Sequence, residues 1–172
     1  MKKYILLLFL LFGVLGFSQQ KDVFDIARSG TLDEMKTLVD QSPDVINSIS
    51  PMGFSPLILA CYRGNVEVAK YLIDQTKDVN YLSPEGTALS SLCINYNKEL
   101  VEKILAKNAD PNIQDSHGNT PLLWAVKRNN IELVKLLLKN KADISIKDSL
   151  GISAFEYGLK SNNNELINLL KH

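Results

Sequence analysis

The chain has 172 residues, of which 45% are hydrophobic, enough for one sizeable core and too few for two large domains. Its 19 basic and 19 acidic residues cancel, and no stretch has the dense positive charge that nucleic-acid binding requires, so nucleic acid is not expected as a partner. Aromatic residues are spread through the chain and no segment has low complexity, which excludes wholesale disorder.

The N-terminal segment has the layout of a signal peptide. Two lysines precede an unbroken apolar run from Tyr4 to Phe17, which is shorter than the roughly 20 residues that a membrane-spanning helix needs. We therefore expect cleavage after Ser18, and a mature protein in the periplasm or outside the cell that has no membrane association. An uncleaved N-terminal anchor is the alternative.

A short glycine-containing segment recurs along the rest of the chain. Its copies begin at Gly53, Gly86, Gly118 and Gly151, which lie 33, 32 and 33 residues apart. A second marker with the same period begins at Asp78, Asp110 and Asp143. Repetition at such a period is typical of stacked repeat proteins.

Between the markers, each unit has the pattern of two short helices. In the stretch Val66 to Ile73, apolar residues recur at the spacing of one buried helix face. Neither helix of a unit exceeds about ten residues, so neighbouring units must cover the apolar faces. Ser55 and Thr120 each precede a proline, which predicts a side-chain cap followed by proline in the first turn of a helix.

At these residues the sequence resembles the ankyrin repeat family. Ser55-Pro56-Leu57 with Ala60, and Thr120-Pro121-Leu122 with Ala125, match the start of that repeat. The resemblance implies an all-α solenoid of about five helix-turn-helix units joined by short β-turn or hairpin loops. We expect a signal peptide over 1–18 and a repeat domain over 19–172, with units at about 22–50, 51–83, 84–115, 116–148 and 149–172.

The chain departs from the family pattern in two ways. The histidine that follows Pro-Leu in the family is replaced in every copy, for example by Ile58 and Leu123. At the end of the first helix, Asn129 and Asn162 tolerate a positive φ, whereas Tyr96 in the third unit does so poorly. We therefore expect the third unit to be locally irregular.

No residue pattern indicates catalysis. The glutamates at 67, 99, 132 and 165 recur at one repeat position, which marks a structural register. His117 and His172 have no nucleophile or second ligand placed by the sequence, and no phosphate-binding loop or metal-binding motif occurs. We expect neither an enzyme nor a cofactor or metal.

Two cysteines occupy equivalent positions in adjacent units. A disulfide between Cys61 and Cys93 would suit an exported protein, but stacked helices lie about 8 to 10 Å apart. That separation exceeds the roughly 7 Å that a disulfide allows between Cα atoms. We predict two buried free thiols.

Partner-binding residues are expected on the turns and on the inner side of the first helices, where ankyrin arrays bind their partners. Exposed aromatic and arginine side chains are common interface anchors. Apolar turn residues could instead fold back and seal the stack, and Trp124 is expected to pack into the core. The candidates are Met52, Phe54, Tyr62, Arg63, Glu85, Ile94, Asn95, His117, Asn119, Lys127, Arg128, Leu150, Ile152 and Lys160.

The resemblance implies a non-catalytic protein-protein interaction module. Exported bacterial ankyrin proteins of this size are similar to accessory factors, some of which support stress defence, and to immunity proteins that neutralise toxic effectors. A self-associating structural protein is a further alternative, although the polar C-terminal unit favours a monomer.

Overall fold

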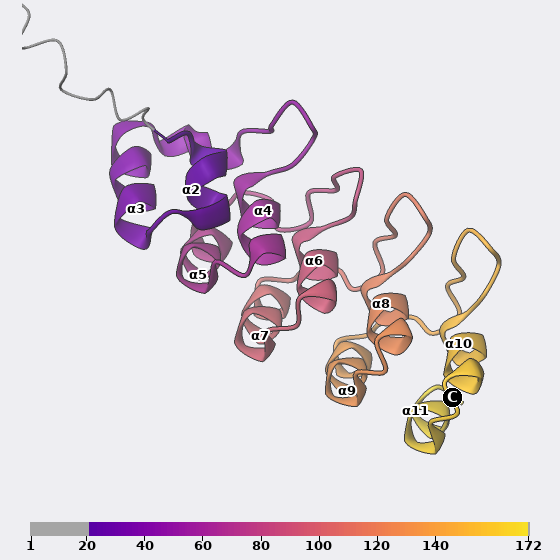
Figure 1. The fold of residues 1–172 in the computed structure, drawn as a ribbon. Helices are drawn as coiled ribbons and strands as arrows, with labels where there is room; N and C mark the ends of the chain where they lie inside the picture. Colours follow the sequence, from indigo (N-terminus) through magenta and orange to yellow (C-terminus); the bar gives the residue numbers. More distant parts are fainter. Residues whose placement is uncertain (1–20, 172) are drawn as a thin grey trace, which may run out of the picture.

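The computed structural model describes residues 21–171, in which ten α-helices and one 3-10 helix form a stack of helix pairs (Figure 1). The first helices of the pairs are α2 (Val23–Ser29), α4 (Pro56–Arg63), α6 (Ala88–Ile94), α8 (Pro121–Lys127) and α10 (Ala154–Lys160). The second helices are α3 (Leu32–Gln41), α5 (Val66–Gln75), α7 (Lys98–Ala106), α9 (Ile131–Lys139) and α11 (Asn164–Leu169). The 3-10 helix η1 (Pro43–Asn47) follows α3 and was not expected. The predicted signal peptide lies outside the described residues.

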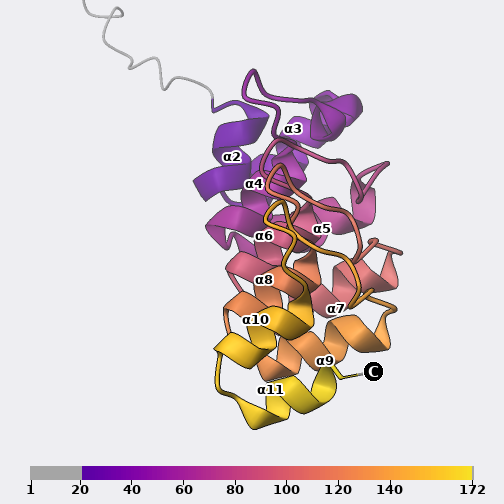
Figure 2. The same cartoon turned by 90° about the vertical axis from the view of Figure 1, so that its right-hand side faces the viewer.

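The pairs stack in chain order, so that every first helix contacts the first helix of the next pair. Figures 1 and 2 show the first helices as one layer, the second helices as another, and the loops between pairs projecting on one side. These hairpin loops span residues 48–55, 76–87, 107–120 and 140–153. Isolated β-bridges join Ser83 to Gly86 and Lys147 to Ser153. The all-α repeat solenoid expected from the sequence is confirmed.

The first helices begin at the predicted capping residues. The side chains of Ser55 and Thr120 accept hydrogen bonds from the amides of Ile58 and Leu123, and a proline follows each cap. Thr87 and Ser153 cap α6 and α10 in the same way. Each cap satisfies a helix-end amide and fixes the angle at which the chain enters the helix.

The ends of the first helices differ between units, as the sequence indicated. Asn129 and Asn162 have φ values of 53° and 56°, in the left-handed region that asparagine tolerates. Tyr96, at the equivalent position, is not in that region, because the preceding cap Asn95 leaves the helical conformation with φ −107° and ψ 77°, whereas the caps of α8 and α10 stay helical. The third unit is therefore irregular at the predicted place.

The core is continuous along the stack. In α4 and α6, six consecutive residues from the start of each helix are buried, because each helix is covered by two neighbouring first helices and by its own second helix. Cys61 and Cys93 are buried free thiols, which confirms their predicted state. Burial raises the pKa of the Cys61 thiol to about 12 and also raises the pKa of Cys93, so both thiols behave as small apolar side chains.

Polar contacts fix the spacing between units. The Asn65 side chain donates to the carbonyl oxygens of Ile26, Ala27 and Gly30, and so joins the first unit to the second. On the second helices, ion pairs cross from unit to unit, such as Lys103 with Asp74 at 2.7 Å. Within residues 21–171, no helix is both long and apolar enough to cross a membrane.

Candidate partner-binding face

One side of the stack consists of the first helices and the hairpin loops 48–55, 76–87, 107–120 and 140–153, and we call it the inner face (Figure 2). Within the described residues, every exposed large hydrophobic side chain belongs to one of these helices or loops, and Leu159, at the repeat position of the buried Val126, is exposed where α10 ends the described stack. Met52 and Leu150, at hairpin tips, are 71% and 75% exposed. The remaining exposed hydrophobic residues are Ile49, Tyr62, Leu82 and Leu159. The opposite side, formed by the second helices, has none in this part of the chain.

A buried carboxylate anchors an aromatic ring in the fourth unit. Asp115 is 8% exposed, and its Oδ2 accepts a hydrogen bond of 3.0 Å from the indole nitrogen of Trp124. Its Oδ1 accepts from the amides of His117 and Asn119, both at 2.9 Å. The hairpin thus holds Asp115 in place, and Asp115 fixes the orientation of the partly exposed Trp124 ring on α8.

The fifth unit repeats this arrangement with a tyrosine. Asp148 Oδ2 accepts a 2.6 Å hydrogen bond from the Tyr157 hydroxyl. The same oxygen forms an ion pair with the Lys127 ammonium group, whose nitrogen lies 3.0 Å away. The amides of Leu150 and Ile152 donate to its Oδ1. Burial raises the pKa of the Asp148 carboxyl, but the four donors outweigh it and hold this pKa well below its usual value of 3.8. Asp148 therefore stays ionised at neutral pH.

Lys127 joins the two aromatic anchors. Its ammonium group lies 4.3 Å from the centroid of the Tyr157 ring and 5.9 Å from that of Trp124, within cation-π range of both rings. It also donates to the side-chain oxygen of Asn119. The side chain is only 25% exposed, so Lys127 serves mainly as an internal link between α8 and the fifth unit.

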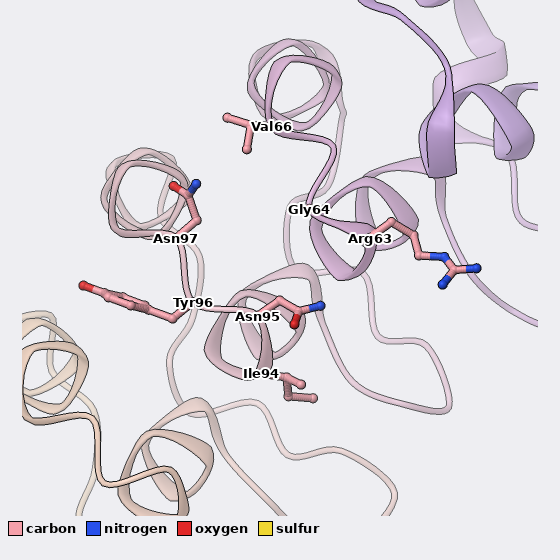
Figure 3. A pocket seen from close by; sticks show the side chains of 7 residues that line it. All are labelled: Arg63, Gly64, Val66, Ile94, Asn95, Tyr96 and Asn97. Atoms are coloured by element: carbon pink, nitrogen blue, oxygen red, sulfur yellow. The ribbon is translucent and has the colours of Figure 1, made fainter.

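A shallow groove of about 420 Å³ lies between the second and third units (Figure 3). It brings together three predicted residues, Arg63, Ile94 and Asn95, and the Asn95 amide donates to the carbonyl oxygen of Tyr62. Figure 3 shows the Tyr96 ring pointing away from Arg63. Burial, with the Glu132 carboxylate nearby, raises the pKa of Tyr96 to about 12, so its hydroxyl stays neutral.

Most of the other predicted residues lie where the sequence placed them. The side chains of Met52, Tyr62, Arg63, Glu85, His117, Arg128, Leu150 and Lys160 are exposed on the inner face. Phe54 and Ile152 are only partly exposed, and Phe54 packs against the core, so this turn residue helps to seal the stack.

The expectation that Asn119 is a surface residue is wrong. It is 4% exposed, because its amide nitrogen donates to Asp115 and its oxygen accepts from Lys127. Trp124 packs against the core as expected, but it leaves part of its ring at the surface. These contacts cross from the hairpin to the helix that follows it, and therefore depend on the three-dimensional path of the turn.

The paired anchors Asp115 with Trp124 and Asp148 with Tyr157 were not expected from the sequence. A signal was present, because each aromatic residue follows its aspartate by nine positions in the chain. In the second unit the equivalent pair is Ser50 with Leu59, which cannot form the same hydrogen bond. Only the fourth and fifth units thus have an aromatic side chain anchored in this way within the described residues.

The repeated helix pairs and projecting hairpins define a helical repeat protein with an extended binding face. A family model for ankyrin repeats in three copies matches residues 23–83 and 88–172. The chain belongs to the ankyrin repeat family. Arrays of this family are in general non-catalytic protein-protein interaction modules.

Several mammalian ankyrin proteins are similar to part of the chain. Ankyrin repeat and SAM domain-containing protein 6 of Rattus norvegicus is 29% identical over 104 residues, which cover 59% of this chain and 12% of that protein. Ankyrin repeat, SAM and basic leucine zipper domain-containing protein 1 of Carollia perspicillata is 28% identical over 121 residues, 67% of this chain and 25% of that protein. The similarity thus spans at most a quarter of these relatives and concerns their repeats.

Proposed function

We propose that the inner face binds a protein partner, with its strongest contacts over the fourth and fifth units. The observation that carries this proposal is the distribution of exposed large hydrophobic side chains, all of which belong to the first helices and hairpin loops in the part of the chain described. Exposed hydrophobic residues gathered on one face are typical of interaction surfaces. Within residues 21–171, the second helices on the opposite face have no exposed large hydrophobic side chain, although they are also helices.

The fourth and fifth units are favoured because their aromatic rings are held in place before binding. Trp124 and Tyr157 each have a hydrogen bond to a buried aspartate, so less side-chain entropy is lost when a partner covers the rings. Leu150 and Leu159 add exposed apolar surface beside them. Aromatic residues of this kind commonly dominate the binding energy of an interface.

Affinity capture from an extract of the protein's own cells tests this function. The bait is compared with a Leu150→Asp/Leu159→Asp variant, in which exposed side chains change and the stability should stay within about 0.5 kcal/mol. We expect one partner whose recovery falls at least tenfold with this variant. A Lys36→Asp/Lys139→Asp variant, altered on α3 and α9 of the other face, should recover the partner normally.

Equal recovery of the partner by the inner-face and outer-face variants would contradict the proposal. The size of the purified protein at two concentrations separates a partner protein from a second copy of the chain. A size that grows with concentration and returns to the monomer in the Leu150→Asp/Leu159→Asp variant would instead support the self-associating alternative.

We also propose that the protein acts outside the cytoplasm, in the periplasm or beyond the cell. The support is the sequence pattern at the N-terminus, two lysines followed by the apolar run up to Phe17. N-terminal sequencing of the protein recovered from its cells should begin at Gln19. A chain that still begins at Met1 in the cytoplasmic fraction would contradict export. The affinity for the captured partner distinguishes an accessory or stress-defence factor from an immunity protein, which binds its toxin much more tightly.

A further inference from the structure

The first helices carry an excess of positive charge. In α4, α6, α8 and α10, with the residue that follows each, the cations are Arg63, Lys127, Arg128 and Lys160, and the acid is Glu156. Among the described residues, Lys127 is the member of this set that has an ion pair. Arg63, Arg128 and Lys160 therefore remain exposed and free to pair with a ligand.

The acids near these cations are already bound within the fold. The Glu156 carboxylate accepts from the amide and the hydroxyl of Ser153, both at 2.7 Å, and closes the cap of α10. In the hairpins, Asp115 and Asp148 are buried. The hairpins also have exposed acids, namely Glu85 and the three aspartates Asp78, Asp110 and Asp143, each of which accepts a hydrogen bond from the backbone amide two residues further on. The inner face thus offers a positive surface over the fourth and fifth units and at Arg63.

The second helices show the opposite charge pattern. Their acids outnumber their bases, and many of the charges pair between units, such as Lys98 with Glu132 and Lys135 with Glu165. The first helices α4 to α10 thus have a net positive charge, whereas the second helices have a net negative charge that is partly paired between units. This asymmetry is hidden in a total charge of zero for the chain.

Stabilisation of helix ends does not account for the excess of cations on these first helices. A cation in the last turn of a helix offsets the helix dipole by about 0.3 to 1 kcal/mol. However, α6 ends without a cation, whereas α8 ends with Lys127 followed by Arg128. The cations concentrate where the aromatic anchors Trp124 and Tyr157 lie, and Lys160 itself is 5.3 Å from the Tyr157 ring centroid.

We propose that the occupant of the inner face is an acidic segment of a partner protein. Its carboxylates pair with Arg128 and Lys160, and with Arg63 if it extends along the stack, while its apolar side chains contact Trp124, Tyr157 and Leu150. The inference rests on the proposed function and adds the chemistry of the partner. The exposed hydrophobic residues favour a polypeptide over nucleic acid, which would need a denser basic patch.

Selection of random dodecapeptides displayed on phage against the purified protein tests this inference. We expect the selected pool to be enriched in Asp and Glu relative to the input library. A selected peptide carrying a fluorescent label should bind at least tenfold more weakly to the Arg63→Glu/Arg128→Glu/Lys160→Glu variant. It should bind within twofold of normal to the Lys36→Glu/Lys139→Glu/Lys171→Glu variant, which has the same change in net charge on the other side of the stack.

Each other outcome has a distinct meaning. Neutral or basic peptides that still lose binding in the Leu150→Asp/Leu159→Asp variant would overturn the acidic partner and leave the proposed function standing. If no peptide is selected above background, both proposals lose support. If a single-stranded DNA 30-mer displaces the acidic peptide with equal affinity, the face recognises polyanions in general, and the acidic protein segment is overturned.

Discussion

Replacement of Asp148 by asparagine is expected to lower the free energy of unfolding by about 3 kcal/mol, the lower end for loss of one partner of a buried ion pair. The Asp148 side chain is 3% exposed and accepts from Lys127, Tyr157 and two backbone amides. Asparagine keeps one acceptor oxygen and turns donor hydrogens toward Lys127 or the Tyr157 hydroxyl. Urea unfolding at pH 7 measures the loss.

The pH dependence gives this prediction a second readout. The folded-state pKa of Asp148 lies below the unfolded value of about 3.8, so the carboxylate contributes stability above that value. The contribution is lost as the pH falls below about 4 toward the folded-state pKa. The difference in unfolding free energy between the natural protein and Asp148→Asn should therefore shrink at pH 3. A difference that is the same at pH 3 and pH 7 would show that the charge of Asp148 contributes nothing.

The Asp148→Asn change is also expected to destabilise one part of the stack more than the rest. Unfolding of a repeat array can begin at its terminal units, so weakening the fifth unit should loosen α10 and α11 before α5 and α7. Amide hydrogen exchange in α10 and α11 should quicken about 100-fold if 3 kcal/mol is lost locally. Asp143→Asn is the control, because Asp143 is an exposed carboxylate that accepts only from the neighbouring Ser145. Its change should be small.

The fold could be predicted because its determinants are local and repeated. Caps such as Ser55 and Thr120, and the left-handed Asn129 and Asn162, depend on a few adjacent residues, and each recurs with the repeat. The irregular backbone after α6 could be predicted for the same reason, since tyrosine at position 96 is unsuited to the left-handed conformation. The 3-10 helix η1 has no counterpart in the other units, so repetition could not reveal it.

The candidate face could be predicted only in part. Residues at turn tips, such as Met52 and Leu150, are exposed because nothing packs beyond them, and the repeat register alone locates them. The burial of Asn119 arises from a network that runs through Asp115, Lys127 and Asp148 across two units. The repeat register shows which unit each of these residues belongs to, but it does not determine which side chains contact one another. The charge difference between the two sides likewise needed the assignment of each helix to a layer.

Replacement of Gly118 by alanine is expected to cost about 3 kcal/mol of unfolding free energy. Its φ of 75° lies in the left-handed region, which costs an alanine about 1 to 2 kcal/mol. In addition, a Cβ atom would lie 2.7 Å from the Ser149 nitrogen, and overpacking against backbone typically costs about 1 to 3 kcal/mol. The clash would push the hairpins of the fourth and fifth units apart.

Gly151→Ala is the matched control for this prediction. Gly151 has nearly the same φ, 73°, but a Cβ there meets nothing within 4 Å, so only the conformational cost of about 1 kcal/mol remains. Chemical denaturation of both variants measures their free energies of unfolding, and the difference separates the cost of the left-handed φ from the cost of the clash between the hairpins. Equal losses would mean that the approach of the two hairpins is unimportant.

The contact at Gly118 also predicts coupling with Asp148. The Ser149 amide donates a 3.0 Å hydrogen bond to the His117 carbonyl, so the hairpin loop 107–120 contacts the residue that follows Asp148. A Gly118→Ala change that displaces this hairpin should disturb the donors around Asp148 as well. The double variant Gly118→Ala/Asp148→Asn should then lose less stability than the sum of the single losses, since both act on one interface. Strict additivity would show that the hairpin contact and the carboxylate network stabilise the fifth unit independently.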